Sequence, residues 1–326
     1  MRKGAFCVGE RPITTRGKTT HLGLRANIDQ RGARAEVSRR KLFEFIQSEE
    51  LAMSDQDVVI HLRRCEGVGP ATLAGLALAS RLRAHVLGLH VVAMSTAAFV
   101  SPEAVAVQVN ETSHLLEEAR QRAPWWQAQL DAAGLKGDFE VVQGDPVDAL
   151  CHAARWSDLV VTERPISNPD APTGWGIASR TVFGTSTPVV VVPEAAQVDK
   201  VGEHILVAWN ASREAALAIH GAMPLLKQAD KVTILEGDST PSPLGLDNLP
   251  KLDLRAWLQR RGINAEFQPF KPKKDHGPAV LEAANKVDAG LIVLGAWGQS
   301  RIAELVLGGV TRHLFQHSNL PLLVAH

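Results

Sequence analysis

Residues 291–298 read Leu-Ile-Val-Leu-Gly-Ala-Trp-Gly, and after nine intervening residues 308–311 read Gly-Gly-Val-Thr. The apolar run at 291–294 predicts a buried strand, and Gly295 and Gly298 predict the turn that leaves it. Glycine lets a backbone come close to a ligand, and the free N–H groups of a helix start favour anions. The stretch therefore predicts a strand, a loop and a helix start that together hold phosphate. A glycine-lined turn that binds nothing is the alternative.

The end of the chain repeats an earlier stretch at an offset of 133 residues, so that Thr162 aligns with Gly295 and Pro188 with Pro321. A gap-free match of two segments at one offset indicates a duplicated domain. We expect a first copy at 53–195, a linker at 196–203 and a second copy at 204–326.

Each copy alternates short Val/Ile/Leu runs with longer helical patterns. This order is typical of βαβ units and predicts an α/β fold, with a doubly wound, five-stranded parallel sheet in each of two tandem domains. The expected strands lie near 57–62, 85–92, 139–143, 158–162, 188–192, 204–209, 231–236, 264–268, 290–294 and 321–325. The expected helices lie near 70–83, 103–133, 146–156, 175–184, 212–227, 248–261, 277–287 and 309–317.

Residues 1–52 differ from the two copies in composition. They carry eleven Lys and Arg residues against six acidic residues, without a sustained apolar period. Such a segment does not predict a packed core. We expect it to be disordered or to be a mis-assigned start extension, because Met53 directly precedes the first expected strand.

The overall charge and the cysteines exclude several classes of protein. Lys and Arg together number 35, as do Asp and Glu, so no net positive field would attract nucleic acid. The apolar runs are far shorter than the roughly 20 residues that span a membrane. Cys7, Cys65 and Cys151 show no Cys-x-x-Cys spacing, which favours reduced thiols in the cytoplasm. The twelve histidines show no zinc-binding spacing, so we expect no metal site.

The spacing of Gly295, Gly298, Gly308 and Thr311 resembles the ATP-binding pattern of the universal stress protein family. The resemblance covers roughly 53–326 and is clearest in the second copy. It implies a tandem member that binds ATP, with ADP or AMP as alternatives and with Mg²⁺, and that acts on protein partners not identified by the sequence. It also implies an intramolecular pseudo-dimer through the last strands, at 189–192 and 322–325, and leaves a homodimer open.

By this resemblance the nucleotide site lies in the second copy, and its expected residues are Trp209, Asn210, Ala211, Gly295, Trp297, Gly298, Gly308, Gly309, Val310 and Thr311. Asn210 stands where the family usually carries an aspartate, so a charge-assisted contact with the nucleoside is lost. Gly309 stands where the family has Ser or Thr, and Thr311 can partly replace that hydroxyl. Alternatively, Asn210 or Ser212 caps the following helix, and the two tryptophans are packing residues.

The first copy lacks the same site. Glu163 would repel phosphate, Pro165 has no N–H, and bulky Trp175 stands where Gly308 stands in the second copy. We expect a degenerate structural partner that binds no ATP.

The sequence contains no Gly-x-Ser-x-Gly motif, no Walker lysine and no metal-binding acidic pair. We therefore expect no catalytic residue and at most weak ATP hydrolysis. The leading hypothesis is a stress-response regulator that binds an adenine nucleotide. The alternative is a scaffold that acts through protein association without nucleotide.

Overall fold

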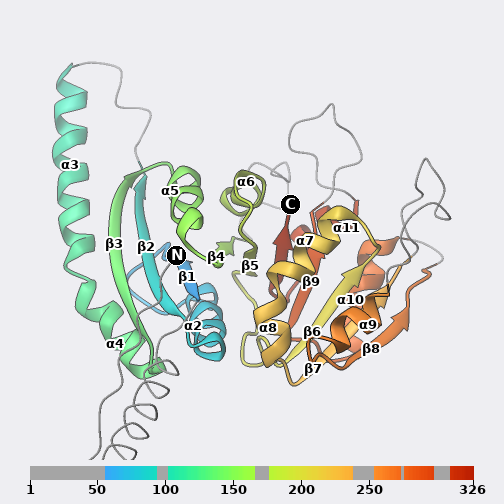
Figure 1. The fold of residues 1–326 in the computed structure, drawn as a ribbon. Coiled ribbons are helices and arrows are strands. Elements are labelled where there is room, and N and C mark those ends of the chain that lie inside the picture. Colours follow the sequence, from blue (N-terminus) through green and yellow to red (C-terminus); the bar gives the residue numbers. More distant parts are fainter. Residues whose placement is uncertain (1–55, 94–101, 166–175, 238–252, 273–274, 297–308) are drawn as a thin grey trace, which may run out of the picture. The chain divides into compact units, whose positions relative to one another are not determined.

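The computed structural model describes residues 56–93, 102–165, 176–237, 253–272, 275–296 and 309–326, with the backbone alone at 102–108 (Figure 1). The expectations for residues 1–52 lie outside this part of the chain.

The first copy contains β1 (Asp57–His61), α2 (Pro70–Leu82), β2 (His85–Ala93), α3 (Pro102–Arg120), α4 (Ala123–Ala133), β3 (Lys136–Gly144), α5 (Pro146–Ala153), a 3₁₀ turn (Ala154–Trp156), β4 (Leu159–Arg164), α6 (Ile177–Gly184) and β5 (Val189–Pro193). The second contains β6 (His204–Trp209), α7 (Arg213–Gly221), α8 (Met223–Gln228), β7 (Lys231–Glu236), α9 (Leu254–Gln259), β8 (Ala265–Pro269), α10 (His276–Lys286), β9 (Leu291–Gly295), α11 (Gly309–His317) and β10 (Leu322–Ala325).

The described strands form one ten-stranded sheet in the order β3-β2-β1-β4-β5-β10-β9-β6-β7-β8. Within each copy all neighbouring strands are parallel, which confirms the doubly wound α/β fold. Between the copies β5 and β10 pair antiparallel, with Leu322 opposite Val191 and Val324 opposite Val189. The last strands of the two copies therefore lie side by side at the centre of the sheet and join its two halves.

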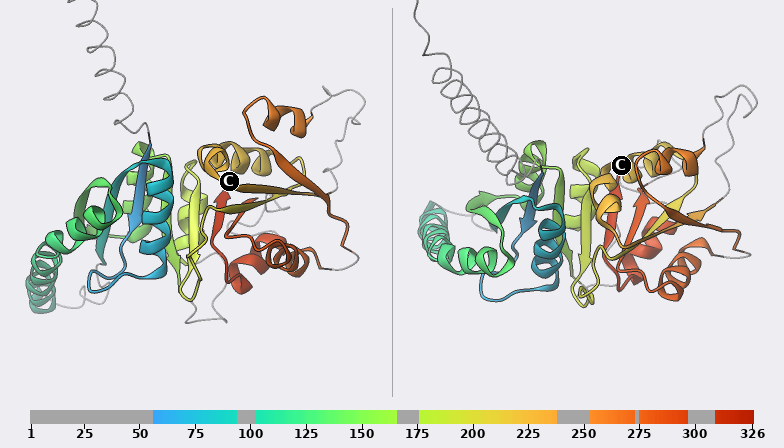
Figure 2. Two further views of the ribbon diagram at one scale, coloured as in Figure 1. Left: turned by 90° about the horizontal axis from the view of Figure 1, so that it is seen from below. Right: turned by 60° about the horizontal axis from the view of Figure 1, so that its bottom comes forward.

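Helices cover both faces of this sheet, as Figure 2 shows. One core packs α2, α4, α7, α8 and α9 against alternate strand residues, among them Val190 of β5 and Leu323 of β10. The other packs α5, α6, α10 and α11 against the residues in between, such as Val189 and Leu322. Because both faces are buried, the central strands are apolar throughout. None of the described helices is long and apolar enough to cross a membrane.

Two of the expected helices are each divided into two helices, and proline explains both divisions. The expected helix 103–133 is divided into α3 and α4, and α4 carries Pro124 at its start. The expected helix 212–227 is divided into α7 and α8, and α8 carries Pro224 at its start. Proline lacks an N–H group, so it suits the first turn of a new helix better than a helix interior.

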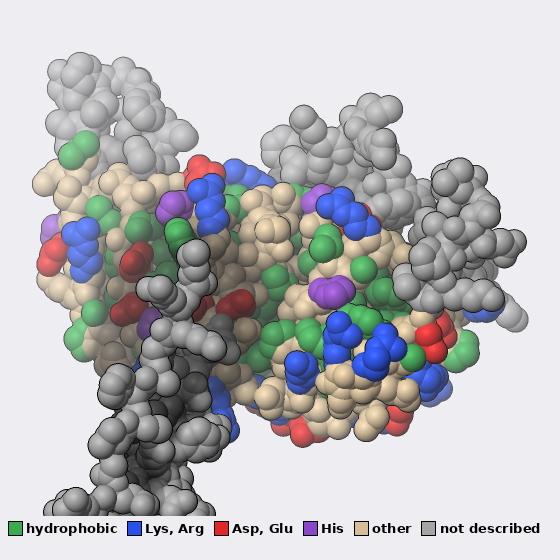
Figure 3. All heavy atoms as spheres, viewed as in Figure 1, with side chains coloured by type: hydrophobic (Ala, Val, Ile, Leu, Met, Phe, Trp, Pro, Cys, Tyr) green, Lys and Arg blue, Asp and Glu red, His purple; other side chains and the backbone are tan. Residues whose placement is uncertain are grey.

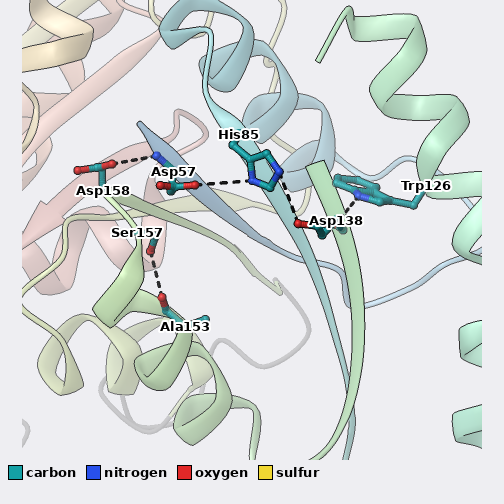
Figure 4. A network of polar contacts seen from close by, with 7 residues as sticks. All are labelled: Asp57, His85, Trp126, Asp138, Ala153, Ser157 and Asp158. Carbon is teal, nitrogen blue, oxygen red and sulfur yellow. Dashed lines mark hydrogen bonds and ion pairs between the residues drawn. The ribbon is translucent and has the colours of Figure 1, made fainter. Parts of the chain in front are cut away.

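Polar contacts occupy the amino ends of the strands in the first copy (Figure 4). His85 lies between Asp57, at 3.6 Å, and Asp138, at 3.5 Å, and so links β1, β2 and β3. The Asp57 backbone N–H donates to Asp158 Oδ2 at 2.8 Å, and Trp126 Nε1 donates to the Asp138 carbonyl oxygen at 2.9 Å. Because the side chains of His85, Asp57 and Asp138 are exposed to solvent, these contacts contribute little to stability.

Lys and Arg side chains gather over α8 and α9 on the face shown in Figure 3. In this region Arg255 lies 4.0 Å over the ring of Phe267, and Arg261 lies 3.9 Å over the ring of Trp257. Arginine stems and guanidinium groups cover aromatic rings favourably in this way. These two cations therefore have a packing role and do not by themselves indicate an anion site.

Candidate functional site

A cavity of about 410 Å³ lies in the second copy, at the carboxyl ends of β6, β7, β8 and β9 and beside the first turns of α10 and α11. This is the edge of an open α/β sheet at which ligands bind. Six of the expected site residues line it: Trp209, Asn210, Gly295, Gly309, Val310 and Thr311. Ala211 belongs to the turn between Asn210 and Ser212 but is not a lining residue of the cavity. Trp297, Gly298 and Gly308 lie outside the described residues.

The turn after β6 shows which residue caps the next helix. Ser212 is the N-cap of α7, and its Oγ accepts a hydrogen bond from the Ala215 backbone N–H at 3.1 Å. Asn210 Oδ1 accepts a hydrogen bond from the Ser212 backbone N–H at 3.2 Å, and Ala211 between them has a left-handed φ of 56°. Asn210 therefore holds the turn and also lines the cavity. Its Nδ2 group supplies donors that an aspartate lacks.

Gly295, at the end of β9, is required by packing as well as by its place in the cavity wall. A Cβ atom there would lie 2.4 Å from the carbonyl carbon of Glu214 and 2.5 Å from the backbone nitrogen of Ala215. The first turn of α7 thus packs directly against the Gly295 backbone. A side chain at this position would push α7 away from β9.

The first turn of α11 presents backbone and one hydroxyl to the same region. Gly309 is exposed, and a Cβ atom there would meet nothing within 4 Å. Thr311 is buried, and its Oγ1 donates to the Gly295 carbonyl oxygen at 3.4 Å. The Thr311 proton is therefore used to join α11 to β9, which leaves the backbone N–H groups of the helix start as the donors for an anion.

Several lining residues were missed from the sequence because they follow β7 and β8 or begin α10. These are Gly237, Phe270, Lys271, Pro272 and His276. The rings of Phe270 and His276 lie 6.1 Å apart in an edge-to-face arrangement. For the residues after β7 and β8, their position after the carboxyl end of a parallel strand is the sequence feature that could have predicted them. Phe270 adds an aromatic surface to the cavity, and Lys271 adds an exposed positive charge.

In the first copy a carboxylate stands at the corresponding edge of the sheet. Glu163, near the end of β4, forms an ion pair with Arg63, which follows β1. A Cβ atom on Gly69, the N-cap of α2, would lie 3.4 Å from Glu163 Oε2. The protein's own acidic group thus lies close to a helix start that would otherwise favour an anionic ligand. Trp175 lies outside the described residues.

Among the described residues, no group of three or more His, Cys, Asp and Glu side chains is placed to hold a metal ion. The described cysteines, Cys65 and Cys151, are both free thiols. Burial raises the pKa of the Cys65 thiol to about 11, against the smaller opposing effect of Arg122. A thiol with so high a pKa is a poor nucleophile at neutral pH.

The family model for the universal stress protein family matches residues 202–326. Among solved structures, a universal stress protein from Archaeoglobus fulgidus is similar with a TM-score of 0.57 and 16% identity, over 83% of this chain and 96% of that chain. A functionally unknown protein from Pseudomonas aeruginosa is similar with a TM-score of 0.50 and 13% identity, over 83% of this chain and 92% of that chain. No curated protein matches the sequence. Residues 202–326 therefore form a domain of the universal stress protein family, and the residues before them form a second domain of the same fold.

Proposed function

We propose that the chain binds an adenine nucleotide, with ATP favoured, in the cavity of its second copy, and that the bound nucleotide regulates contacts with protein partners. The observation that carries this proposal is the meeting of the α11 start with the carboxyl ends of β6 and β9 around one cavity of about 410 Å³. Small-molecule sites commonly have volumes of about 300–1,000 Å³. The match of residues 202–326 to the universal stress protein family supports the same proposal, because these residues contain the cavity.

The cavity offers different surfaces to the two ends of a nucleotide. Leu235, Phe270, Val280 and Leu294 supply apolar and aromatic surface suited to a base. Gly309 and Val310, at the start of α11, supply backbone N–H groups suited to phosphate, and Lys271 adds positive charge at the lining. Asn210 supplies a neutral hydrogen-bonding group suited to the nucleoside, because its amide can donate to a ribose oxygen or a ring nitrogen.

The two copies are proposed to be domains at 53–195 and 204–326, joined by a linker at 196–203. The antiparallel pairing of β5 with β10 supports an intramolecular pseudo-dimer, because it joins equivalent strands of the two copies. Two free cysteines in the described part of the chain fit a reducing compartment, so we place the protein in the cytoplasm.

A nucleotide-free scaffold is the second candidate. It is favoured by the hydrogen bonds that already engage Asn210 Oδ1 and the Thr311 hydroxyl within the protein. A scaffold would act through protein contacts alone, so it predicts no saturable nucleotide binding. Binding stoichiometry separates the two candidates.

The test is a calorimetric titration of Mg-ATP into the full chain and into the variants Gly309→Glu and Gly309→Gln. We expect one equivalent of ATP to bind, and Gly309→Glu to weaken binding at least tenfold because its carboxylate stands at the phosphate-binding helix start. Gly309→Gln has nearly the same size without the charge and should weaken binding less. A Cβ atom at this position meets no described atom within 4 Å, so we expect neither variant to disturb the fold.

Two results would overturn the proposal. Folded, nucleotide-free wild-type protein that shows no saturable binding would favour the scaffold. Equal affinity for ATP in the wild type and Gly309→Glu would place the nucleotide away from α11.

Adding the hydroxyl that the family pattern carries should strengthen binding. Gly309→Ser places an O–H donor at the α11 start, where it can meet a phosphate oxygen. One hydrogen bond contributes about 1 kcal/mol, so we expect roughly fivefold tighter ATP binding. Gly309→Ala is the matched control, because it adds the Cβ atom without the hydroxyl. If serine and alanine give the same affinity, the added hydroxyl does not reach the ligand.

A further inference from the structure

Arg164 belongs to the first copy but contacts the helix that lines the cavity of the second. Arg164 is the last residue of β4, and its Nη2 donates to the Ser318 carbonyl oxygen at 2.8 Å. Its Nη1 donates to the Gln316 carbonyl oxygen at 3.3 Å. Both carbonyls lie at the carboxyl end of α11 or just beyond it. We infer that Arg164 is a positioning residue, which fixes α11 so that its first turn meets the anionic end of the ligand.

The surroundings of Arg164 suit this role. Its Nε atom is buried and makes no hydrogen bond within the described part of the chain, so the guanidinium is held mainly through its two outer nitrogens. The last carbonyl groups of a helix lack partners inside the helix, and the negative end of the helix dipole favours a cation there. Removing the guanidinium would leave the Gln316 and Ser318 carbonyl oxygens without these donors.

The opposite end of α11 carries the residues that line the cavity. Gly309, Val310 and Thr311 form its first turn, and Thr311 is joined to Gly295 of β9. A nine-residue helix is only about 14 Å long, so a tilt at one end displaces the other. The flank of α11 packs tightly on α10, where a Cβ atom on Gly277 would lie 2.5 Å from His313 Cβ. Arg164 therefore adds a contact from the other copy to those that α11 makes through Thr311, through His313 and through its core residues Leu314 and Phe315.

Arg81 provides a matched comparison. It also belongs to the first copy, in α2, and its Nη1 donates to the Gln228 carbonyl oxygen at 3.3 Å. Gln228 is the last residue of α8 in the second copy, so Arg81 caps α8 as Arg164 caps α11. No residue of α8 lines the cavity. The Arg81 guanidinium also lies 3.7 Å from Glu203 Oε1 and from Asp230 Oδ2, so ion pairs add to its contact with the second copy. The two arginines hold different helices, and of these two helices only α11 lines the cavity.

The experiment compares Arg164→Met, Arg164→Lys and Arg81→Met in the full chain. Mg-ATP affinity is measured by calorimetry well below each protein's unfolding temperature, and hydrogen exchange of the α8 and α11 backbone amides is measured without ATP. We expect Arg164→Met to weaken ATP binding about three- to tenfold and to speed exchange in α11 alone. Arg164→Lys, which keeps the charge but has one donor nitrogen in place of two, should recover part of the affinity. Arg81→Met should speed exchange in α8 and change ATP affinity less than twofold.

The inference rests on the proposed function, and the two can fail separately. If wild-type protein binds no ATP, the proposed function fails, while exchange in α11 still shows whether Arg164 fixes that helix. The inference would be overturned if the backbone amides of α11 exchanged hydrogen at the same rate in Arg164→Met as in the wild type. Equal loss of ATP affinity in Arg164→Met and Arg81→Met would also overturn it, because the effect would then be general to contacts between the copies.

Discussion

Replacing Gly295 with alanine is expected to destabilise the folded chain by about 2–3 kcal/mol in the absence of any nucleotide. The added Cβ atom would lie 2.4 Å from the carbonyl carbon of Glu214 and 2.5 Å from the backbone nitrogen of Ala215. Both are backbone atoms of the first turn of α7, so no side-chain rotation relieves the overlap. The helix itself must move away from β9. Urea unfolding of the two proteins at neutral pH measures the difference.

Gly309→Ala is the matched control for this prediction. Gly309 also lines the cavity, but a Cβ atom there meets nothing within 4 Å. We expect its unfolding free energy to change by no more than about 0.5 kcal/mol. If both alanine variants lose little stability, the close approach of α7 to Gly295 is wrong. A large loss at Gly295 alone would show that this glycine serves helix packing whether or not a nucleotide binds.

Acid is expected to destabilise the fold through His61, a buried residue of β1 that forms a hydrogen bond with Thr162 Oγ1 at 3.0 Å. Burial lowers the pKa of His61 to about 4, and electrostatic repulsion, mainly from Arg63, adds to the effect. The unfolded chain, with an ordinary histidine pKa near 6.5, binds a proton more readily than the folded chain. The His61 contribution to the free energy of unfolding is therefore fully present above about pH 6.5. It decreases between about pH 6.5 and 4 and is constant below that range.

The size of this effect follows from the same two pKa values. At pH 4.5 the His61 contribution amounts to a loss of about 2–3 kcal/mol relative to neutral pH. Urea unfolding of the wild type and of His61→Gln at pH 7 and pH 4.5 isolates it. Burial also lowers the pKa of His204, but that contribution is common to both proteins and cancels in the comparison. An identical loss of stability with acid in both proteins would contradict the prediction.

The fold could be predicted from the sequence because its signals are local. Apolar runs and glycines after strands depend on neighbouring residues, and they predicted where the strands lie along the chain in both copies. The 133-residue offset repeats these local patterns, so it indicated the duplication. Proline is also a local signal, because it disfavours the interior of a helix. Pro124 and Pro224 begin new helices where continuous helices were expected.

The candidate site was predicted only in part. The glycine spacing located the α11 start and the end of β9, and both line the cavity. The roles of individual residues were decided by partners that the spacing does not show. Gly295 faces α7, and Thr311 donates its proton to Gly295. Phe270 and His276 reach the cavity only because β8 and α10 end and begin beside it.

By itself, the sequence determined that this protein contains two copies of a parallel α/β unit and that the second copy carries a glycine-rich helix start after its fourth strand. Only the tertiary structure decided what holds that helix start in place. The carbonyls at the far end of α11 are bound by Arg164, more than 150 residues earlier in the chain. Periodicity and motif spacing reflect the local backbone, whereas hydrogen bonds across the β5–β10 junction depend on how the two copies pack.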